Sequence, residues 1–585
     1  VATRARGSVR PQHIARWRSS VPTHKMDGKR TKRQRTGPSA GVHPATASPS
    51  TPSASPADAP GSQEESKSVV EQLQGDAVDL SEMALGEGGT DVRNVVEWMR
   101  SIPSTLTRLK IDVPNASAEV VDALHSLVAK TTTLAELDAM EGRSNLNVLQ
   151  LNGTEKVKEM NLYREELGPV SAAIIAACVQ RNPVLESLHL TDNNLCGLDH
   201  NGRGTYTSEG ITKLCEALKE SNVTSLNLAN TRLCGLNERH GHVHGHGTYT
   251  AEGITKLCEG LKGSAVTSLN LHGNYIGDDG AFELAAVLKE TRISQLNLDR
   301  NDFGPVGGVY LAEGLKGNST LEVLDLGGNR LCGLYKDIQI DEHSYSSSVI
   351  QGTYTTLGIS KLCEGLKGTA VTSLSLDDNY IQDHGAIELA AVLKDMQITT
   401  LKLSGNHIGG NYSDEDGFAA TTEGIIALCE GLKGSSVTSL DLAENQLCGL
   451  YKDDYGIQGT YITEAITKLC EGLKESSVAS LDVSGNNITG DAADQLANMV
   501  LEHASMTDFC GIPLTSLREN SITELNLKAK GVSVPGAIVL GKLLPSAAAL
   551  TLLNLRANNI GDKGATAIAA VLKEMMISEL DLVYN

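Results

Sequence analysis

The sequence predicts an α/β fold built from stacked strand–turn–helix units, and three observations support this prediction. A phrase of the form Leu-x-x-Leu-x-Leu-x-x-Asn recurs along the chain, the basic period is about 28 residues, and a helix-like segment follows the copies. Stacked repeats share one continuous core with their neighbours. The 585 residues are therefore expected to form one solenoid, although length alone suggests about four domains of roughly 150 residues.

The copies of the phrase can be marked by their second apolar residue. There are thirteen such residues: Met160, Leu188, Leu226, Leu269, Leu296, Leu324, Leu374, Leu401, Leu440, Leu481, Leu525, Leu553 and Leu580. Six of the twelve steps between them are 27 or 28 residues long, and the other six range from 38 to 50 residues. The long steps indicate a base unit that is interrupted by insertions.

The first half of each unit predicts a strand and a turn. Alternation in Leu-x-Leu places both leucines on one buried side of a strand, with the residue between them on the opposite face. The Asn that follows, for example Asn274 or Asn379, is suited to hydrogen-bond the backbone of neighbouring turns. Without such a partner, those backbone groups would be left unpaired inside the protein.

The second half of each unit predicts a helix with one buried face. In residues 280–288 the apolar residues recur at i, i+3, i+4 and i+7, which are Ala281, Leu284, Ala285 and Leu288. Five cysteines occupy the same helix face in other copies: Cys215, Cys258, Cys363, Cys429 and Cys470. Because free Cys packs as a small hydrophobe and apolar surroundings raise its pKa, we expect buried packing groups here, not nucleophiles.

Four insertions have related ends. Each begins at Leu-Cys-Gly-Leu and ends at Gly-Thr-Tyr, and the tyrosines are Tyr206, Tyr249, Tyr354 and Tyr461. This predicts a duplicated loop at one edge of the solenoid, either functional or a tolerated expansion, with the second slightly favoured. One insertion carries alternating imidazoles that are a candidate site for Zn²⁺ or Cu²⁺, although the sister loops have no matching ligands. These residues are His240, His242, His244 and His246.

The N-terminal part differs in composition. Residues 1–66 are basic and then rich in Pro and Ser, which predicts a disordered tail. A basic cluster in this tail fits a nuclear import signal and a solvated tail equally well. The cluster consists of Lys29, Arg30, Lys32, Arg33 and Arg35. Residues 67–145 predict a helical cap with a possible degenerate repeat around Leu109, and residues 146–585 predict the solenoid, which ends inside a repeat and is expected to be truncated at the C-terminus.

Charge and composition exclude several classes of protein. The net charge of -21 divides into +10 over residues 1–40 and -31 over the rest, so the main domain is a poor ligand for nucleic acid. No 18-residue apolar run occurs, so we expect no transmembrane helix and no membrane partner. The 11 Cys include no CxxC pair, which favours a reduced protein of the cytoplasm, the nucleus or both. No catalytic signature is present, so we expect neither an enzyme nor a cofactor.

In motif, period and helix content, the sequence resembles the ribonuclease-inhibitor-like leucine-rich repeat family. The repeats of Ran GTPase-activating proteins and of NOD-like receptors belong to the same family. The resemblance covers about residues 146–585 and implies a right-handed β-α superhelix, or horseshoe, with a parallel sheet on the concave side and helices on the convex side. It implies little about function, because solenoids of this kind serve many partners.

The candidate binding surface is the face of the predicted sheet that lies opposite the leucines. Its side chains are polar and mildly acidic, so a partner protein with a basic patch would suit it, although an ordinary solvated sheet would have the same composition. The residues that we single out are Asn270, Asn297, Asp299, Asp325, Asp377, Asp378, Asp441 and Asp482.

The leading hypothesis is an intracellular, non-enzymatic protein–protein interaction scaffold that acts through this face and the edge loops. One alternative is a GTPase-activating protein of the Ran type, with a small GTPase as its partner. No catalytic Arg can be matched, however, and the insertions depart from the compact repeats of those proteins. The other alternative is the ligand-sensing repeat region of a larger NOD-like receptor.

Overall fold

The computed structural model describes residues 77–79, 90–101, 106–111, 118–131, 133–139, 146–235, 249–340, 346–413, 417–453 and 456–585. They belong to one unit, Ser66–Asn585, and the other unit, Val1–Glu65, is outside the described residues. The predicted disordered tail, the basic cluster at 29–35 and the imidazoles at 240–246 therefore also lie outside them.

Within the described residues, twelve strands form one sheet in the order β22-β21-β20-β17-β14-β13-β10-β9-β8-β7-β6-β5. Their bounds are β5 (Glu159–Asn161), β6 (Ser187–His189), β7 (Ser225–Asn227), β8 (Ser268–Asn270), β9 (Gln295–Asn297), β10 (Val323–Asp325), β13 (Ser373–Ser375), β14 (Thr400–Lys402), β17 (Ser439–Asp441), β20 (Ser480–Asp482), β21 (Asp508–Phe509) and β22 (Ile512–Pro513). Strands β5 to β21 pair in parallel, and equivalent leucines are in register: Leu324 pairs with Leu296 on one side and Leu374 on the other. The insertions therefore leave the ladder unshifted.

Two smaller sheets contain the remaining repeat strands. One holds β23 (Glu524–Asn526), β24 (Leu552–Asn554) and β25 (Glu579–Asp581), all parallel. The other holds β1 (Ala77–Asp79), β2 (Arg108–Ile111), β3 (Glu136–Ala139) and β4 (Leu146–Asn147), of which β1 to β3 are parallel. Val78 and Leu109 are buried like the leucines of the later strands. The degenerate repeat expected around Leu109 is thus present as β2 and α3 (Ala118–Lys130), and a further strand–helix unit, β1 and α2 (Thr90–Ser101), precedes it in place of a purely helical cap.

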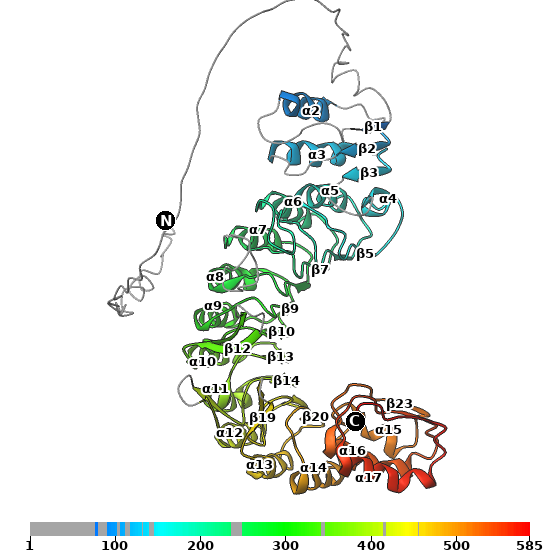
Figure 1. Ribbon diagram of the computed structural model, residues 1–585. Coiled ribbons are helices and arrows are strands. Elements are labelled where there is room, and N and C mark those ends of the chain that lie inside the picture. Colours follow the sequence, from blue (N-terminus) through cyan, green and yellow to red (C-terminus); the bar gives the residue numbers. More distant parts are fainter. Residues whose placement is uncertain are drawn as a thin grey trace, which may run out of the picture. The chain divides into compact units, whose positions relative to one another are not determined.

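The helices form a layer alongside the strands (Figure 1), and most pack on the next helix along the chain. The α-helices are α2 (Thr90–Ser101), α3 (Ala118–Lys130), α4 (Val148–Leu151), α5 (Pro169–Val179), α6 (Glu209–Leu218), α7 (Glu252–Leu261), α8 (Gly277–Val287), α9 (Pro305–Leu315), α10 (Leu357–Leu366), α11 (Gln382–Ala390), α12 (Glu423–Leu432), α13 (Glu464–Leu473), α14 (Gly490–Glu502), α15 (Leu514–Arg518), α16 (Ser533–Leu543) and α17 (Gly561–Val571). Short 3₁₀ turns are η2 (Leu288–Glu290), η3 (Leu393–Asp395), η4 (Leu544–Ser546) and η5 (Leu572–Glu574). The α/β solenoid fold is confirmed.

The core lies between the two layers and consists mainly of Leu, Ile, Val and Ala. The five cysteines predicted on the helix face are all buried and free, as expected. Burial raises the pKa of Cys258 to about 12, so this thiol is protonated and unreactive at neutral pH.

A ladder of buried asparagines closes the turns after the strands. Asn406 Oδ1 accepts the N–H groups of Asn379 (2.9 Å) and Ile381 (3.3 Å), and its Nδ2 donates to the carbonyl of Leu376 (2.8 Å). Asn445 accepts in the same way from the N–H of Asn406 (3.1 Å). The asparagine ladder comprises Asn193, Asn274, Asn301, Asn329, Asn379, Asn406, Asn445, Asn486 and Asn558, all buried. The predicted role of the repeat Asn is confirmed.

Three long steps of the repeat contain β-hairpins in the described part of the chain, and the first and third of these hairpins lie in insertions that carry the shared end motifs. The hairpins pair β11 (Leu334–Ile340) with β12 (Ser346–Gly352), β15 (Gly410–Ser413) with β16 (Gly417–Ala420), and β18 (Leu450–Asp453) with β19 (Gly456–Gly459).

The shared end motifs form the base of the β11–β12 and β18–β19 hairpins. Gly352 has a φ of 106°, and a Cβ there would lie 2.1 Å from the carbonyl oxygen of Gly333, so only glycine fits. Tyr354 then donates its hydroxyl to the carbonyl of Ile381 (2.6 Å) and accepts from the N–H of Gly385 (3.2 Å). The motifs thus tie each insertion to the next repeat, which is a structural reason for their recurrence.

Candidate functional site

The structure places the eight predicted partner-binding residues at or just after the ends of six strands of the large sheet, β8, β9, β10, β13, β17 and β20. Five of them end a strand: Asn270, Asn297, Asp325, Asp441 and Asp482. The other three, Asp299, Asp377 and Asp378, follow the strands β9 and β13 in sequence. Register places Asn297 beside Asp325 and Asp441 beside Asp482. We call the six aspartates the acidic row.

Several of these side chains also stabilise their own turns. The carboxylate of Asp325 accepts the N–H of Gly327 (3.0 Å), and that of Asp441 accepts the N–H of Ala443 (2.9 Å). In a neighbouring repeat, Asn297 makes the same bond to the N–H of Asp299 (2.9 Å) with a neutral amide oxygen. The turn therefore needs an oxygen acceptor but no charge, and the aspartates add negative charge beyond what the fold requires.

The acidic row is electrostatically strained. Burial, and then the carboxylates of Asp482 and Asp377, raise the pKa of Asp441 from 3.8 to about 6. Burial also raises the pKa of Asp377, with a smaller contribution from Asp325. Lys402, on the strand between β13 and β17, lowers the pKa of both Asp441 and Asp377. A cation from outside would relieve the repulsion that remains.

The raised pKa of Asp441 predicts a pH-dependent stability. Between about pH 4 and pH 6 the folded chain holds this proton more tightly than the unfolded chain, so the free energy of unfolding falls as pH rises through that window.

Asp441→Asn keeps the turn acceptor and removes the charge. We expect its melting temperature to exceed that of the native chain by about 1–3 °C at pH 7.5, solvent screening limiting the effect. At pH 4 the difference should vanish. Equal melting temperatures of the native chain and Asp441→Asn at pH 7.5 would contradict the raised pKa of Asp441.

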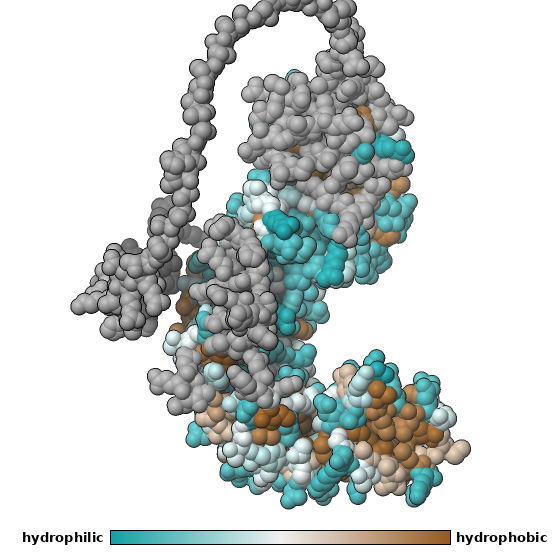
Figure 2. All heavy atoms as spheres, viewed as in Figure 1, coloured by the Kyte–Doolittle hydropathy of each residue, from teal (hydrophilic) through white to brown (hydrophobic). Residues whose placement is uncertain are grey.

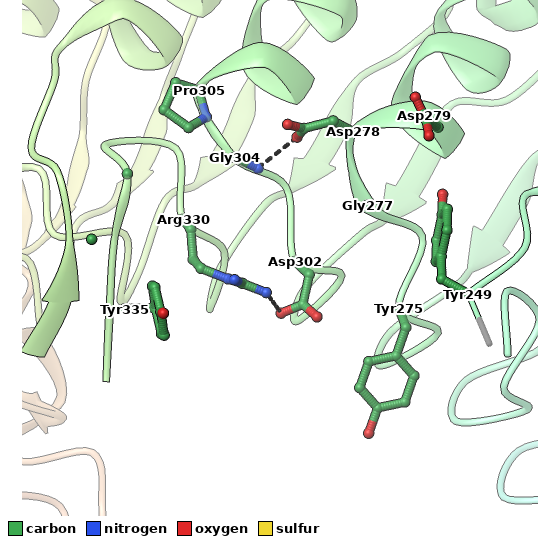
Figure 3. A pocket seen from close by; sticks show the side chains of 12 residues that line it. Tyr249, Tyr275, Gly277, Asp278, Asp279, Asp302, Gly304, Pro305, Arg330 and Tyr335 are labelled. Carbon is green, nitrogen blue, oxygen red and sulfur yellow. Dashed lines mark hydrogen bonds and ion pairs between the residues drawn. The ribbon is translucent and has the colours of Figure 1, made fainter. Parts of the chain in front are cut away.

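A cavity of about 640 Å³ lies at the edge of the solenoid that carries the insertions (Figure 3). Its walls come from the turns after β8, β9 and β10 and from the base of the β11–β12 hairpin. The lining residues are Tyr249, Tyr275, Gly277, Asp278, Asp279, Asp302, Gly304, Pro305, Arg330, Gly333, Tyr335 and Gly352. We call this the edge pocket.

Sequence reasoning missed the edge pocket, although the repeat spacing contained a signal for it. The steps that end at Leu269 and Leu374 are 43 and 50 residues long, whereas the two steps between them, through Leu296, are only 27 and 28. Two short repeats therefore lie between two insertions and leave a notch at that edge.

Inside the edge pocket, one cation is already paired. Arg330 forms an ion pair with Asp302, and the two side chains are only 9% and 13% exposed. The guanidinium also lies over the ring of Tyr335, 5.0 Å from its centroid. The carboxylate of Asp278 accepts the N–H groups of Gly304 (2.7 Å) and Gly307 (2.9 Å), and burial raises its pKa.

Further along the same edge, aromatic rings cluster around the next hairpins. Tyr380 stacks on His407 with centroids 5.4 Å apart, and Phe418 contacts both His407 (6.3 Å) and Tyr451 (5.3 Å). Burial lowers the pKa of His407 to about 4, so this ring is neutral at physiological pH. This edge of the solenoid thus carries a cluster of aromatic side chains.

The surface of the repeats is not uniform. Figure 2 shows hydrophobic side chains gathered over the C-terminal repeats, where the exposed residues include Met576, Val583 and Tyr584. Hydrophilic residues predominate on the visible face of the earlier repeats (Figure 2). In the part of the chain that the structure describes, no helix is long and apolar enough to cross a membrane.

Comparison with known proteins gives one family match. A family model described as Leucine Rich repeat matches residues 265–285, 476–497 and 549–569. A search of curated proteins finds no match. Among solved structures, the chain is similar to the leucine-rich repeat-containing protein LegL7 from Legionella pneumophila, with 19% identity, 67% of this chain and 90% of that chain covered, and a TM-score of 0.31.

Proposed function

Because the chain is a leucine-rich repeat protein, we propose that it is a protein-interaction scaffold whose acidic row binds a partner with a basic patch. Repeat solenoids present extended surfaces that suit protein partners. The scaffold acts without catalysis, as a surface that holds its partner by charge and shape.

The observation that supports this proposal most directly is the charge that the fold does not need. Asn297 and Asp325 are paired in register and make the same turn bond, one with a neutral and one with a charged side chain. The aspartates therefore add a negative field, and complementary charge on a partner would speed and orient its association.

We further propose that the protein works in the cytoplasm, the nucleus or both. All 11 cysteines are free and buried, which supports a compartment that keeps thiols reduced. The alternatives of Ran-type GTPase activation and of a NOD-like receptor remain predictions from the resemblance, because no specific contact among the described residues favours them.

A triple variant tests the proposal without disturbing the fold. Asp325→Asn, Asp441→Asn and Asp482→Asn together remove three charges and keep the turn acceptors that Asn270 and Asn297 use naturally. Exposed ion pairs are worth about 0.5 kcal/mol each, so binding of the captured partner should weaken about tenfold. The measurement is affinity capture from the source cells followed by titration of the enriched protein.

The matched control removes the same number of negative charges from the helix side of the solenoid. Glu259→Gln, Glu430→Gln and Glu471→Gln alter exposed residues of α7, α12 and α13 and should leave binding unchanged. Binding by the native chain should also weaken as salt rises. Equal binding by the two triple variants would contradict the proposed surface.

A further inference from the structure

We propose that the edge pocket is a receptor for one arginine side chain of the protein partner. The pocket lies close to the acidic row in sequence, since Asp302 follows Asp299 by three residues. The inference rests on the proposed function only in taking the ligand to be part of a basic protein.

The edge pocket has the volume of a typical ligand site, and its walls are rigid. Its volume of about 640 Å³ falls within the roughly 300–1,000 Å³ that is typical of ligand pockets. Rigid elements form its walls, because Gly333 and Gly352 fix the hairpin base and Pro305 begins α9. The notch is therefore a built feature of the repeat pattern.

The charges that line the pocket favour a cation. Three carboxylates face it, from Asp278, Asp279 and Asp302, against the single guanidinium of Arg330. Asp302 already neutralises Arg330, and Asp278 accepts only neutral backbone donors. Asp279 is exposed and forms no ion pair within the described residues. Three carboxylates against one guanidinium leave the described lining net negative, although Arg330 also lowers the pKa of Asp278, and an anionic ligand would be repelled.

The pocket also shows how it would hold a guanidinium. Arg330 lies over the Tyr335 ring and against the carboxylate of Asp302. On the opposite side of the pocket, Asp279 lies beyond the hydroxyl end of Tyr249 (Figure 3). The hydroxyl of Tyr249 donates to the carbonyl of Ile276 (2.6 Å), which fixes the ring.

The pocket therefore presents a tyrosine ring and a carboxylate a second time, from Tyr249 and Asp279. Tyr275, which also lines the pocket, is already close to the positive charge of Arg232. Tyr249 and Asp279 are thus the groups that a partner's arginine would meet.

The probe is the tripeptide acetyl-Gly-Arg-Gly-amide, and its comparison is the same peptide with citrulline, which has the shape of arginine without the charge. Binding to the full chain is measured by saturation-transfer difference NMR and by calorimetry. We expect millimolar affinity for the arginine peptide, at least tenfold weaker binding of the citrulline peptide, and transfer concentrated on the arginine side chain.

Two variants locate the site. Asp279→Asn should weaken binding of the arginine peptide at least fivefold with an unchanged melting temperature, because Asp279 is exposed. Glu471→Gln, which removes one charge from the exposed side of α13, should have no effect on this peptide. Equal binding of the two peptides, equal binding by the native chain and Asp279→Asn, or no binding of the arginine peptide would each overturn the proposal.

The outcomes separate this inference from the proposed function. If the triple row variant loses its partner while the arginine peptide fails to bind, the row is supported and the pocket is refuted. If the peptide binds as expected while the triple variant keeps its partner, the pocket is supported and the row is refuted.

Discussion

Replacing Asn445 with alanine is expected to lower the free energy of unfolding by about 3–5 kcal/mol. Its Oδ1 accepts the N–H groups of Asn406 (3.1 Å) and Ile408 (3.2 Å), and its Nδ2 donates to the carbonyl of Leu403 (2.8 Å). Alanine leaves these buried groups unpaired, and each unpaired group costs about 1–3 kcal/mol. Urea denaturation measures the loss, and hydrogen exchange should place it in the repeats around β14 and β17.

The protein itself provides the control for this variant. Thr231 occupies the same position in another repeat and donates its hydroxyl to the carbonyl of Leu228 (2.9 Å). Asn445→Thr should therefore cost less than Asn445→Ala, because it keeps one polar partner. A loss below about 1 kcal/mol for the alanine variant would show that water replaces the asparagine ladder.

Replacing Arg330 alone with alanine is also expected to lower the free energy of unfolding by about 3–5 kcal/mol. Urea denaturation again measures the loss. Arg330 and Asp302 form a buried ion pair, and removing the cation leaves the carboxylate in a poorly solvated site. Tyr335 also loses the guanidinium that lies over its ring. The edge pocket should then be less well ordered, with faster hydrogen exchange at the hairpin base.

A double variant shows whether the loss of stability comes from the unpaired charge of Asp302 or from the lost packing of the Arg330 side chain. Arg330→Met with Asp302→Asn removes both charges, so no unpaired ion is left in the buried site, and asparagine tolerates the φ of 63° at this position. We expect the double variant to be more stable than Arg330→Ala by at least 2 kcal/mol. If the double variant is no more stable than the alanine variant, packing and not the unpaired charge accounts for the loss.

The repeat strands could be predicted because their signal is local and periodic. Leu440 pairs with Leu401 and Leu481, and the Leu-x-Leu phrase marks all three. The strand around Leu109 was expected as a degenerate repeat, whereas β1 was not, because Val78 stands where a leucine is usual. The place of β1 in a sheet became evident only from its pairing with β2.

The roles of the insertions and the edge pocket depend on contacts between distant repeats. Gly333 and Gly352 meet across a hairpin base, and Tyr354 bonds to a carbonyl 27 residues further on. A repeated phrase shows that such a contact exists but does not show its geometry. The sequence likewise marked Asp441 as a surface acid, yet its turn bond to Ala443 and its raised pKa follow only from the neighbours that surround it.

The sheet side of the solenoid is proposed to bind a basic protein through its acidic row. Carbodiimide crosslinking joins carboxylates directly to lysines, so crosslinking of the chain with its captured partner, read by mass spectrometry, tests this claim most directly. We predict crosslinks from Asp325, Asp441 and Asp482 to partner lysines. Crosslinks confined to helix-side acids such as Glu259, Glu430 and Glu471 would contradict it.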